Sequence, residues 1–212
     1  MALREIGFDE VFVFDVSQKP DRCRENLLRL RELYDRMSKE RKCVLYSPLE
    51  DYVFGEGNPC ASVVFVGEAP GEEEVLQKRP FVGKAGKLLD KTLSVAGIKR
   101  EDVYITNVVK SRPPQNRKPS QKEIQSCVDY LRKEILIIMP KLIVCLGATA
   151  VEGIIGRQMS VTKLSKKLFD YPLKSGIKVF VTYHPAYVLR NQGAEADFIN
   201  DIKTVAELLS NL

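Results

Sequence analysis

The chain has 212 residues, of which 44% are hydrophobic and 29% charged, and its net charge is +5. This length suits one domain with a full hydrophobic core, and no apolar run approaches the ~18 residues of a membrane-spanning helix. Residues 1–10 are too acidic and too interrupted by charges for a signal peptide, so we expect a cytoplasmic protein with no membrane association. The modest positive charge suits a polyanionic partner without requiring one.

Helices and strands are predicted to alternate along most of the chain. Residues 21–41 have the apolar spacing of an amphipathic helix, and we divide the chain into an N-terminal extension with this helix packed on the body (1–42) and one α/β domain (43–212). Ser120 and Glu123 form a capping-box pattern after Pro119, which predicts the start of a long helix that Pro140 ends. We expect strands at 62–66, 102–109, 142–146 and 178–183, and helices at 83–96, 120–139, 148–155 and 196–209.

This order of elements predicts a mainly parallel, four-stranded central sheet that is covered by helices on both faces. The segments 43–59 and 156–176 are expected to be irregular connections. Four loops then follow the four strands: Gly67–Gly71, the region of Asn107, Gly147–Thr149 and His184–Pro185. Because ligands of open α/β sheets bind beyond the carboxyl ends of the strands, we expect the site at this edge.

Four residue types near this edge suit a planar, polar ligand. His184 is the only histidine and can donate a hydrogen bond, and the amide of Asn107 offers both a donor and an acceptor. Glu68 supplies a carboxylate within a glycine-bounded turn, and the ring of Phe81 can stack on a planar base. Each residue alone also fits a structural role in a core or a turn. Together they indicate a pocket for one flipped base.

A basic segment lies between the second strand and the long helix. Residues 110–122 read KSRPPQNRKPSQK and contain no acidic residue. Three prolines stiffen the segment, which could therefore hold a phosphate backbone, while a solvated loop with scattered lysines is the alternative. The candidate DNA-binding residues of this segment are Lys110, Arg112, Arg117 and Lys118.

The five cysteines are Cys23, Cys43, Cys60, Cys127 and Cys145, and none forms a C-x-x-C pair. Their odd number and the absence of a secretory signal lead us to expect no disulfide framework. Their spacing announces no metal site, although cysteines that are distant in sequence can meet in a fold.

Several blocks of sequence resemble the family 4 uracil-DNA glycosylases over residues 43–209. The blocks are FGEGNP (54–59), GEAPG (67–71), RPFVGKAGKLLD (79–90), ITNVVKSRPPQNRKP (105–119), PKLIVCLGATA (140–150) and TYHPAYVLRN (182–191). The resemblance implies a three-layer α/β/α fold and a monofunctional enzyme that hydrolyses the N-glycosidic bond of deoxyuridine in DNA. Its partner is then uracil-containing DNA, and its products are free uracil and an abasic site. Nothing in the sequence demands more than a monomer.

The resemblance also implies roles for individual residues. Phe81 matches the residue that stacks on uracil, Asn107 the one that reads its polar edge, and His184 the donor to uracil O2. Gly67, Glu68 and Ala69 match the motif that shapes the pocket and positions water, and Glu68 and Asn107 are the groups available to orient that water. Leu189 and Arg190 match a loop that enters the DNA near the vacated base.

The sequence departs from this family at its iron–sulfur site. Family 4 enzymes usually hold a [4Fe–4S] cluster on four cysteines, whereas the matching positions here are Glu40, Cys43, Ser111 and Cys127. We therefore expect no cofactor, unless Cys23 or Cys60 completes the ligand set or a different metal binds. Val75 and Lys78 also replace the Asp and Gly that the pattern predicts in the first-motif loop.

A second reading stays open from the sequence. The chain could be a non-catalytic glycosylase-like protein that binds deaminated or abasic DNA, or a repair or replication partner. The missing cluster ligands favour this reading, whereas Glu68, Phe81, Asn107 and His184 favour catalysis. A superfamily member that becomes covalently trapped through its histidine is disfavoured by Glu68, and a nucleotide-binding regulator is disfavoured because no G-x-G-x-x-G follows a strand.

Overall fold

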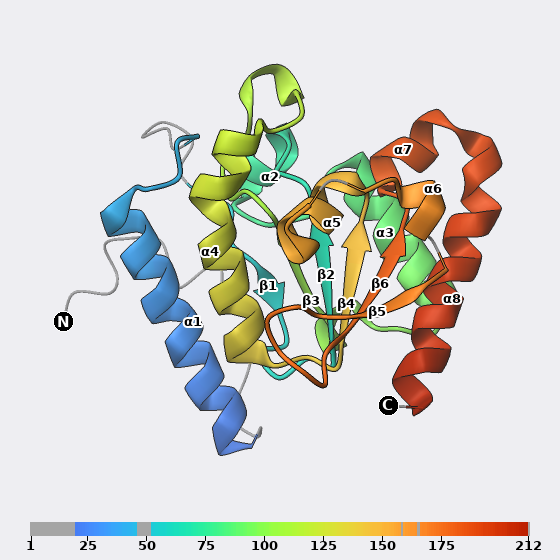
Figure 1. Ribbon diagram of the computed structural model, residues 1–212, viewed down its shortest axis with the longest axis horizontal. Helices are drawn as coiled ribbons and strands as arrows, with labels where there is room; N and C mark the ends of the chain where they lie inside the picture. Colours follow the sequence, from blue (N-terminus) through green and yellow to red (C-terminus); the bar gives the residue numbers. More distant parts are fainter. Residues whose placement is uncertain (1–19, 46–51, 158, 165, 212) are drawn as a thin grey trace.

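The computed structural model describes residues 20–45, 52–157, 159–164 and 166–211, which fold around one six-stranded sheet (Figure 1). The strand order across the sheet is β1-β3-β2-β4-β6-β5. The strands are β1 (Glu56–Gly57), β2 (Val63–Gly67), β3 (Tyr104–Asn107), β4 (Leu142–Leu146), β5 (Leu168–Asp170) and β6 (Lys178–Thr182).

The four central strands are parallel, as the sequence predicts, but the sheet has two further strands at its edges. β1 pairs with β3 and β5 pairs with β6, both antiparallel. The prediction of four strands was therefore too low. β1 has only two residues and β5 only three, each half-buried or exposed, so neither carries the apolar run by which strands are recognised in sequence.

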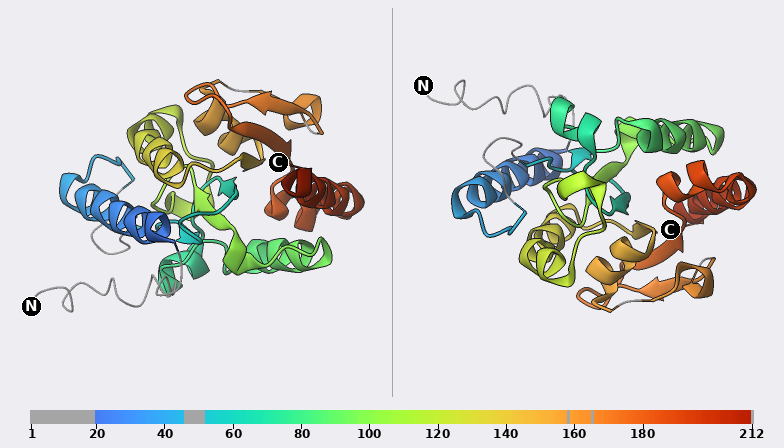
Figure 2. Two further views of the ribbon diagram at one scale, coloured as in Figure 1. Left: turned by 90° about the horizontal axis from the view of Figure 1, so that it is seen from below. Right: turned by 90° about the horizontal axis from the view of Figure 1, so that it is seen from above.

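Both faces of the sheet are buried, and side chains along each strand alternate between two core clusters. In β2, Val64 and Val66 enter the cluster that includes residues of α1, α4 and α5, whereas Val63 and Phe65 enter the cluster with α3 and α8. Figure 2 shows α1 and α4 side by side on one side of the sheet and α3 and α8 on the other. The three-layer α/β/α architecture is thus confirmed. The helices are α1 (Asp21–Glu40), α2 (Glu72–Gln77), α3 (Lys84–Val95), α4 (Gln121–Ile138), α5 (Ala148–Ile155), α6 (Val161–Leu164), α7 (Pro185–Arg190) and α8 (Glu195–Asn211).

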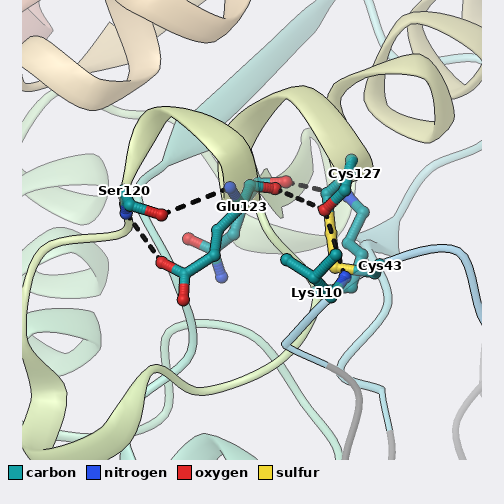
Figure 3. Close-up of a disulfide and its surroundings, with 8 residues drawn as sticks. Cys43, Lys110, Ser120, Glu123 and Cys127 are labelled. Atoms are coloured by element: carbon teal, nitrogen blue, oxygen red, sulfur yellow. Dashed lines mark hydrogen bonds between the residues drawn. A yellow bond between two sulfur atoms is a disulfide. The ribbon is translucent and has the colours of Figure 1, made fainter.

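The start of α4 confirms the predicted capping box. The Ser120 amide donates to Glu123 Oε2 at 2.7 Å, and the Glu123 amide donates to Ser120 Oγ at 3.4 Å (Figure 3). These bonds satisfy two donors that a helix start otherwise leaves without partners. The helix ends at Ile138, because Met139 is left-handed and Pro140 follows.

The predicted N-terminal helix is present and packs on α4 through a buried polar contact. The Tyr34 hydroxyl of α1 contacts the hydroxyl of Tyr104 and the carboxylate of Glu134. Leu30, Leu33 and Met37 of α1 belong to the same core cluster as the sheet. Residues 1–19 of the predicted extension lie outside the described residues, and the boundary at residues 42 and 43 stays a prediction. Among the described residues, no helix combines the length and apolarity needed to span a membrane.

Two disulfides cross-link the chain, which makes the prediction of no disulfides wrong. Cys23 pairs with Cys60 and Cys43 pairs with Cys127 (Figure 3), at Cα separations of 5.3 and 5.0 Å, and Cys145 is free. Disulfides typically join Cα atoms about 4.4–6.8 Å apart. The partners are 37 and 84 residues apart in sequence, so spacing gave no sign of either pair.

Candidate active site

The loops that follow β2, β3 and β6 open into a pocket of about 410 Å³ at the carboxyl edge of the sheet. Protein pockets that bind small molecules typically have volumes of about 300–1,000 Å³. Seven of the residues predicted for the site contribute to its wall: Glu68, Ala69, Phe81, Asn107, Arg117, His184 and Arg190.

Gly67 stands just behind this wall and makes room for two of its members. A Cβ at Gly67 would lie 2.4 Å from Phe81 Cζ and 2.4 Å from Asn107 Oδ1, closer than any side chain tolerates. Gly67 is the last residue of β2 and pairs in register with Asn107, the last residue of β3. A residue without a side chain at this position therefore lets the ring and the amide converge at the end of the sheet.

Phe81 reaches the pocket through an unusual backbone conformation. Its φ is +53°, in the left-handed region that bulky residues rarely occupy, and its side chain is buried. The ring centroid lies 5.7 Å from that of the His184 imidazole, with the two planes tilted by 34°. Strained residues of this kind persist only where the surroundings hold them, and they cluster at functional sites.

Asn107 presents an unpaired acceptor to the pocket. The side chain is 2% exposed, and Oδ1 accepts no hydrogen bond from any residue in the described part of the chain. A buried acceptor without a partner costs about 1–3 kcal/mol. A ligand with an N–H group in the pocket would relieve that cost.

His184 is positioned as a neutral hydrogen-bond donor. It caps α7, and its Nδ1 accepts the Ala186 amide at 3.1 Å, so the proton of the neutral ring resides on Nε2. Desolvation lowers the pKa of His184 to about 4; the positive charge of Arg190 adds to this effect and Glu74 opposes it. Near neutral pH the imidazole is therefore uncharged and can donate through Nε2–H.

Glu68 contributes a carboxylate whose orientation is fixed. Its Oε2 accepts the Thr149 hydroxyl at 2.5 Å, and Thr149 is buried in the first turn of α5. The link joins the loop after β2 to the start of α5, which follows β4. A carboxylate held in this way can orient a water molecule within the pocket.

Lys110 does not contact solvent, so its prediction as a DNA-binding residue was wrong. Its side chain is fully buried, and Nζ donates to Glu134 Oε2 at 2.6 Å, to Thr106 Oγ1 at 2.5 Å and to the Asn107 carbonyl at 2.9 Å. Burial lowers the pKa of Lys110 and Glu134 opposes that shift. Lys110 instead stabilises the end of β3 through its bonds to Thr106 and to the Asn107 carbonyl.

Three other basic residues of the segment, Arg112, Arg117 and Lys118, have acidic partners. Arg117 forms a two-pronged ion pair with Glu123, at 2.6 and 2.8 Å, and this pair is the main reason that the pKa of Glu123 falls to about 2. Arg112 Nη2 lies 3.3 Å from Glu72 Oε2, and Lys118 Nζ lies 3.9 Å from Glu152 Oε2. All three acids lie outside residues 110–122. The positive charge that the segment offers to DNA is thus smaller than its composition indicates.

Leu189 and Arg190 lie on α7, the helix that His184 caps, and both are exposed. Arg190 lines the pocket, whereas Leu189, Arg112 and Lys118 lie outside its wall. The exposed Tyr187, which stacks on Tyr183 with ring centroids 5.3 Å apart, also lines the pocket and was missed in the sequence. Its place in the block TYHPAYVLRN was the available signal.

Glu74 is a second lining residue that sequence reasoning missed. Its carboxylate accepts the backbone amides of Val82 and Gly83 at 2.9 and 2.8 Å, and that of Gly71 at 3.0 Å. It therefore fastens the glycine loop to the turn that carries Phe81. In sequence it is one of three consecutive glutamates, and nothing distinguishes it from its neighbours.

The residues at the predicted cluster positions do not fit a four-thiolate iron–sulfur site. Cys43 and Cys127 are bonded to each other, Glu40 accepts the Tyr130 hydroxyl at 2.7 Å, and Ser111 is buried. Cys23 and Cys60, which could have completed a ligand set, also pair with each other. No group of three or more His, Cys, Asp or Glu in the described ranges could hold a metal ion.

Comparison with known proteins agrees with this fold. The model of the Uracil DNA glycosylase superfamily matches residues 54–207, and the chain belongs to that superfamily. The Type-4 uracil-DNA glycosylase of Thermotoga maritima is 46% identical over 173 residues, which cover 81% of this chain and 88% of that protein. That of Archaeoglobus fulgidus is 43% identical over 173 residues, covering 79% and 87%. That of Sulfurisphaera tokodaii is 43% identical over 185 residues, covering 84% of each.

Proposed function

We propose that this chain is a DNA repair enzyme that hydrolyses the N-glycosidic bond of deoxyuridine in DNA. It releases free uracil and leaves an abasic site. The observation that carries the proposal is the convergence of Phe81, Asn107 and His184 on one pocket, in a chain of the uracil-DNA glycosylase superfamily.

Asn107 and Phe81 select the base. The unpaired Oδ1 of Asn107 accepts the N3–H of uracil, whereas cytosine presents an acceptor at that position and leaves Oδ1 unsatisfied. The ring of Phe81 stacks on the flipped base. A site that must hydrogen-bond its ligand rejects analogues that lack the matching group, because its own buried polar atom then stays unpaired.

His184 stabilises the departing base. Cleavage of the C1′–N1 bond leaves its electron pair on uracil, so negative charge builds on O2 while positive charge builds on the sugar. The Nε2–H of neutral His184 donates to O2 without giving up its proton, in the manner of an oxyanion-hole donor. The low pKa of the imidazole supports this role, since a neutral ring is present throughout the physiological pH range.

A water molecule completes the reaction at C1′. Its oxygen bonds to C1′, one of its protons passes to solvent, and the uracil anion takes up a proton after release. Glu68, which Thr149 holds in place, is the group that we assign to orient this water, with Asn107 as its neighbour.

Arg117 and Arg190 at the pocket are the first candidates for phosphate contacts, with Arg112 and Lys118 farther along the basic segment. We assign Leu189, which is exposed on α7, to the loop that enters the duplex beside the vacated base. We propose that the enzyme acts as a monomer on uracil-containing DNA. We also propose a cytoplasmic location, because its substrate is DNA.

We propose that the enzyme works without an iron–sulfur cluster. The support is that four of its five cysteines are consumed in two disulfides and that the other two cluster positions hold Glu40 and Ser111. The loss of the cluster ligands also favours the alternative function, a non-catalytic protein that binds deaminated or abasic DNA or a repair partner. Catalysis and binding must therefore be measured separately.

The test compares His184→Ala and Asn107→Ala with the unsubstituted protein, by release of free uracil and by affinity for uracil-containing DNA. Removing one oxyanion-type donor costs about a hundred- to a thousandfold in rate. We expect losses of this size in uracil release with DNA affinity largely retained. Equal losses of release and affinity would assign both residues a structural role, and no release by the unsubstituted protein would favour the non-catalytic reading.

A further inference from the structure

The turn that carries Phe81 is held by two charged side chains that bind its backbone from opposite directions. We propose that one of them, Arg100, is a positioning residue that keeps the Phe81 ring in the base pocket. The proposal rests on the proposed function, because the ring matters only if the pocket receives a base. Arg100 lies outside the pocket wall, and its hydrogen bond to the Phe81 carbonyl links it to a pocket-lining residue.

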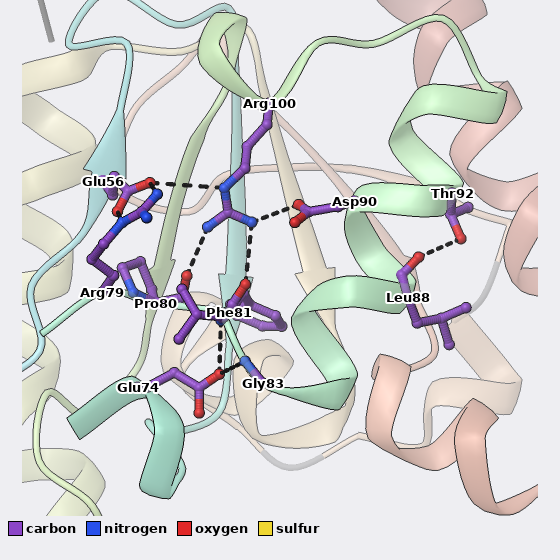
Figure 4. A network of polar contacts seen from close by, with 11 residues as sticks. Glu56, Glu74, Arg79, Pro80, Phe81, Gly83, Leu88, Asp90, Thr92 and Arg100 are labelled. Carbon is purple, nitrogen blue, oxygen red and sulfur yellow. Dashed lines mark hydrogen bonds and ion pairs between the residues drawn. The ribbon is translucent and has the colours of Figure 1, made fainter. Parts of the chain in front are cut away.

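Arg100 binds two successive carbonyl groups of the turn. Its Nη2 donates to the Pro80 carbonyl at 2.7 Å, and its Nη1 donates to the Phe81 carbonyl at 3.2 Å (Figure 4). A guanidinium presents its donors in a rigid planar fork, so one side chain can fix two neighbouring peptide groups. Because the donor is charged, these hydrogen bonds are stronger than those between neutral groups.

Arg100 is itself fixed by two acidic residues from other elements. Nη1 donates to Asp90 Oδ1 of α3 at 2.6 Å, and Nε lies 3.8 Å from Glu56 Oε1 of β1. The Arg100 side chain is only 23% exposed. The guanidinium is thus oriented before any ligand arrives, which is the property that a positioning residue requires.

Glu74 holds the remaining groups of the same turn. Its Oε1 accepts the amides of Val82 and Gly83, so the carbonyls of residues 80 and 81 bind a cation while the next two amides bind an anion (Figure 4). On the α3 side, a Cβ at Gly86 would lie 1.9 Å from the Phe81 carbonyl oxygen. The left-handed conformation of Phe81 is therefore enclosed on several sides, and Arg100 supplies the contacts that hold its carbonyl.

Arg79 provides a matched control for Arg100. It binds the same carboxylate, with Nε and Nη2 donating to Glu56 at 2.6 and 2.7 Å, and it is closer to Phe81 in sequence. No hydrogen bond joins its side chain to the backbone of the turn in the described part of the chain, and the side chain is 46% exposed. Substitution of Arg79 thus removes a charge and a Glu56 ion pair but leaves the two carbonyl contacts in place.

The test is a double-mutant cycle with Arg100→Gln and Phe81→Ala, with Arg79→Gln as control. A small misplacement of a group in a catalytic site can cost about a hundredfold. We expect Arg100→Gln to lower kcat/KM for uracil release by about ten- to a hundredfold, and Arg79→Gln by less than about threefold. In the Phe81→Ala background, Arg100→Gln should add less than about threefold, because its effect passes through the ring. An equal loss in both backgrounds would overturn the proposal.

A second readout does not depend on catalysis. In protein labelled with 4-fluorophenylalanine, the fluorine resonance of Phe81 is the one that Phe81→Ala removes. We expect Arg100→Gln to shift or split this resonance and Arg79→Gln to leave it unchanged; an unchanged resonance in Arg100→Gln would overturn the proposal even if the variant is less active or less stable. Failure of the unsubstituted protein to release uracil would overturn the proposed function instead.

Discussion

The ring centroid of Phe81 lies 5.7 Å from that of the His184 imidazole, although Phe81 belongs to a turn between α2 and α3 and His184 caps α7. The two rings are tilted by 34°, and both line the same pocket. A flipped base that stacks on Phe81 therefore comes within reach of the His184 donor. In the proposed mechanism, recognition of the base and stabilisation of its departing charge thus depend on one local geometry.

The lowered pKa of His184 predicts the pH profile of excision. With a folded pKa of about 4, the imidazole is neutral at pH 6 and above, so kcat/KM for uracil release should be flat between about pH 6 and 8. Single-turnover rates in buffers of constant ionic strength measure this profile. A fall in rate as the pH drops through about 6.5, the ordinary histidine pKa, would contradict the lowered pKa, because the inactive protonated imidazole would then form near its usual pH.

The same group also contributes to stability in a defined direction. The unfolded imidazole binds a proton near its ordinary pKa of about 6.5, whereas the folded one resists protonation until about pH 4. The contribution is therefore complete above about pH 6.5 and declines as the pH falls toward 4. Thermal unfolding of His184→Gln should show a weaker fall of Tm over that interval than the unsubstituted protein, and an identical pH dependence would contradict the assignment.

Gly67→Ala should remove activity by crowding the site. Its Cβ would overlap both the Phe81 ring and Asn107 Oδ1, so we expect excision to fall by at least about a hundredfold, with a stability cost of about 1–3 kcal/mol. Gly97→Ala is the control: an alanine there is strained by its backbone, at φ +73°, but its Cβ meets nothing within 4 Å. It should lose some stability and keep its activity. Equal activities for the two variants would place the pocket elsewhere.

Charge reversal of Arg112 and Arg117 tests whether the basic segment binds DNA. We expect both substitutions to weaken binding for every DNA sequence and to reduce the slope of log affinity against log salt by about one for each phosphate that the variant no longer neutralises. The ion pairs with Glu72 and Glu123 also break, so unfolding must be measured in parallel. An unchanged salt slope would remove the segment from the interface.

Reduction of the disulfides should affect stability more than catalysis. The bond between Cys43 and Cys127 joins residues 84 positions apart, and neither cysteine lines the pocket. A crosslink of this span is worth about 2–5 kcal/mol, so a thiol reductant should lower Tm while single-turnover excision at moderate temperature persists. A loss of excision that precedes unfolding would show that the crosslink holds the site together.

The sequence predicts those features that depend on local pattern. The apolar runs at 63–66 and 142–146 are buried on both faces, so their strands were recognisable, and strand ends then placed Asn107 and His184 at one edge. The acid partners of Arg112 and Arg117, the disulfides and the binding of Arg100 to the Phe81 turn were not predictable, because each joins segments that only the folded chain brings together. Lys110 was predicted to bind DNA because it lies in a segment rich in basic residues, but its side chain turns inward to Glu134.

The most direct test is single-turnover cleavage of a labelled oligonucleotide with one uracil, followed by alkali to break the abasic site. Iron content and visible absorbance are recorded on the same protein preparation. We predict strand scission at the uracil with no stoichiometric iron and no iron–sulfur absorbance. Absence of scission with tight retention of the oligonucleotide would contradict the account and leave a non-catalytic DNA-binding protein.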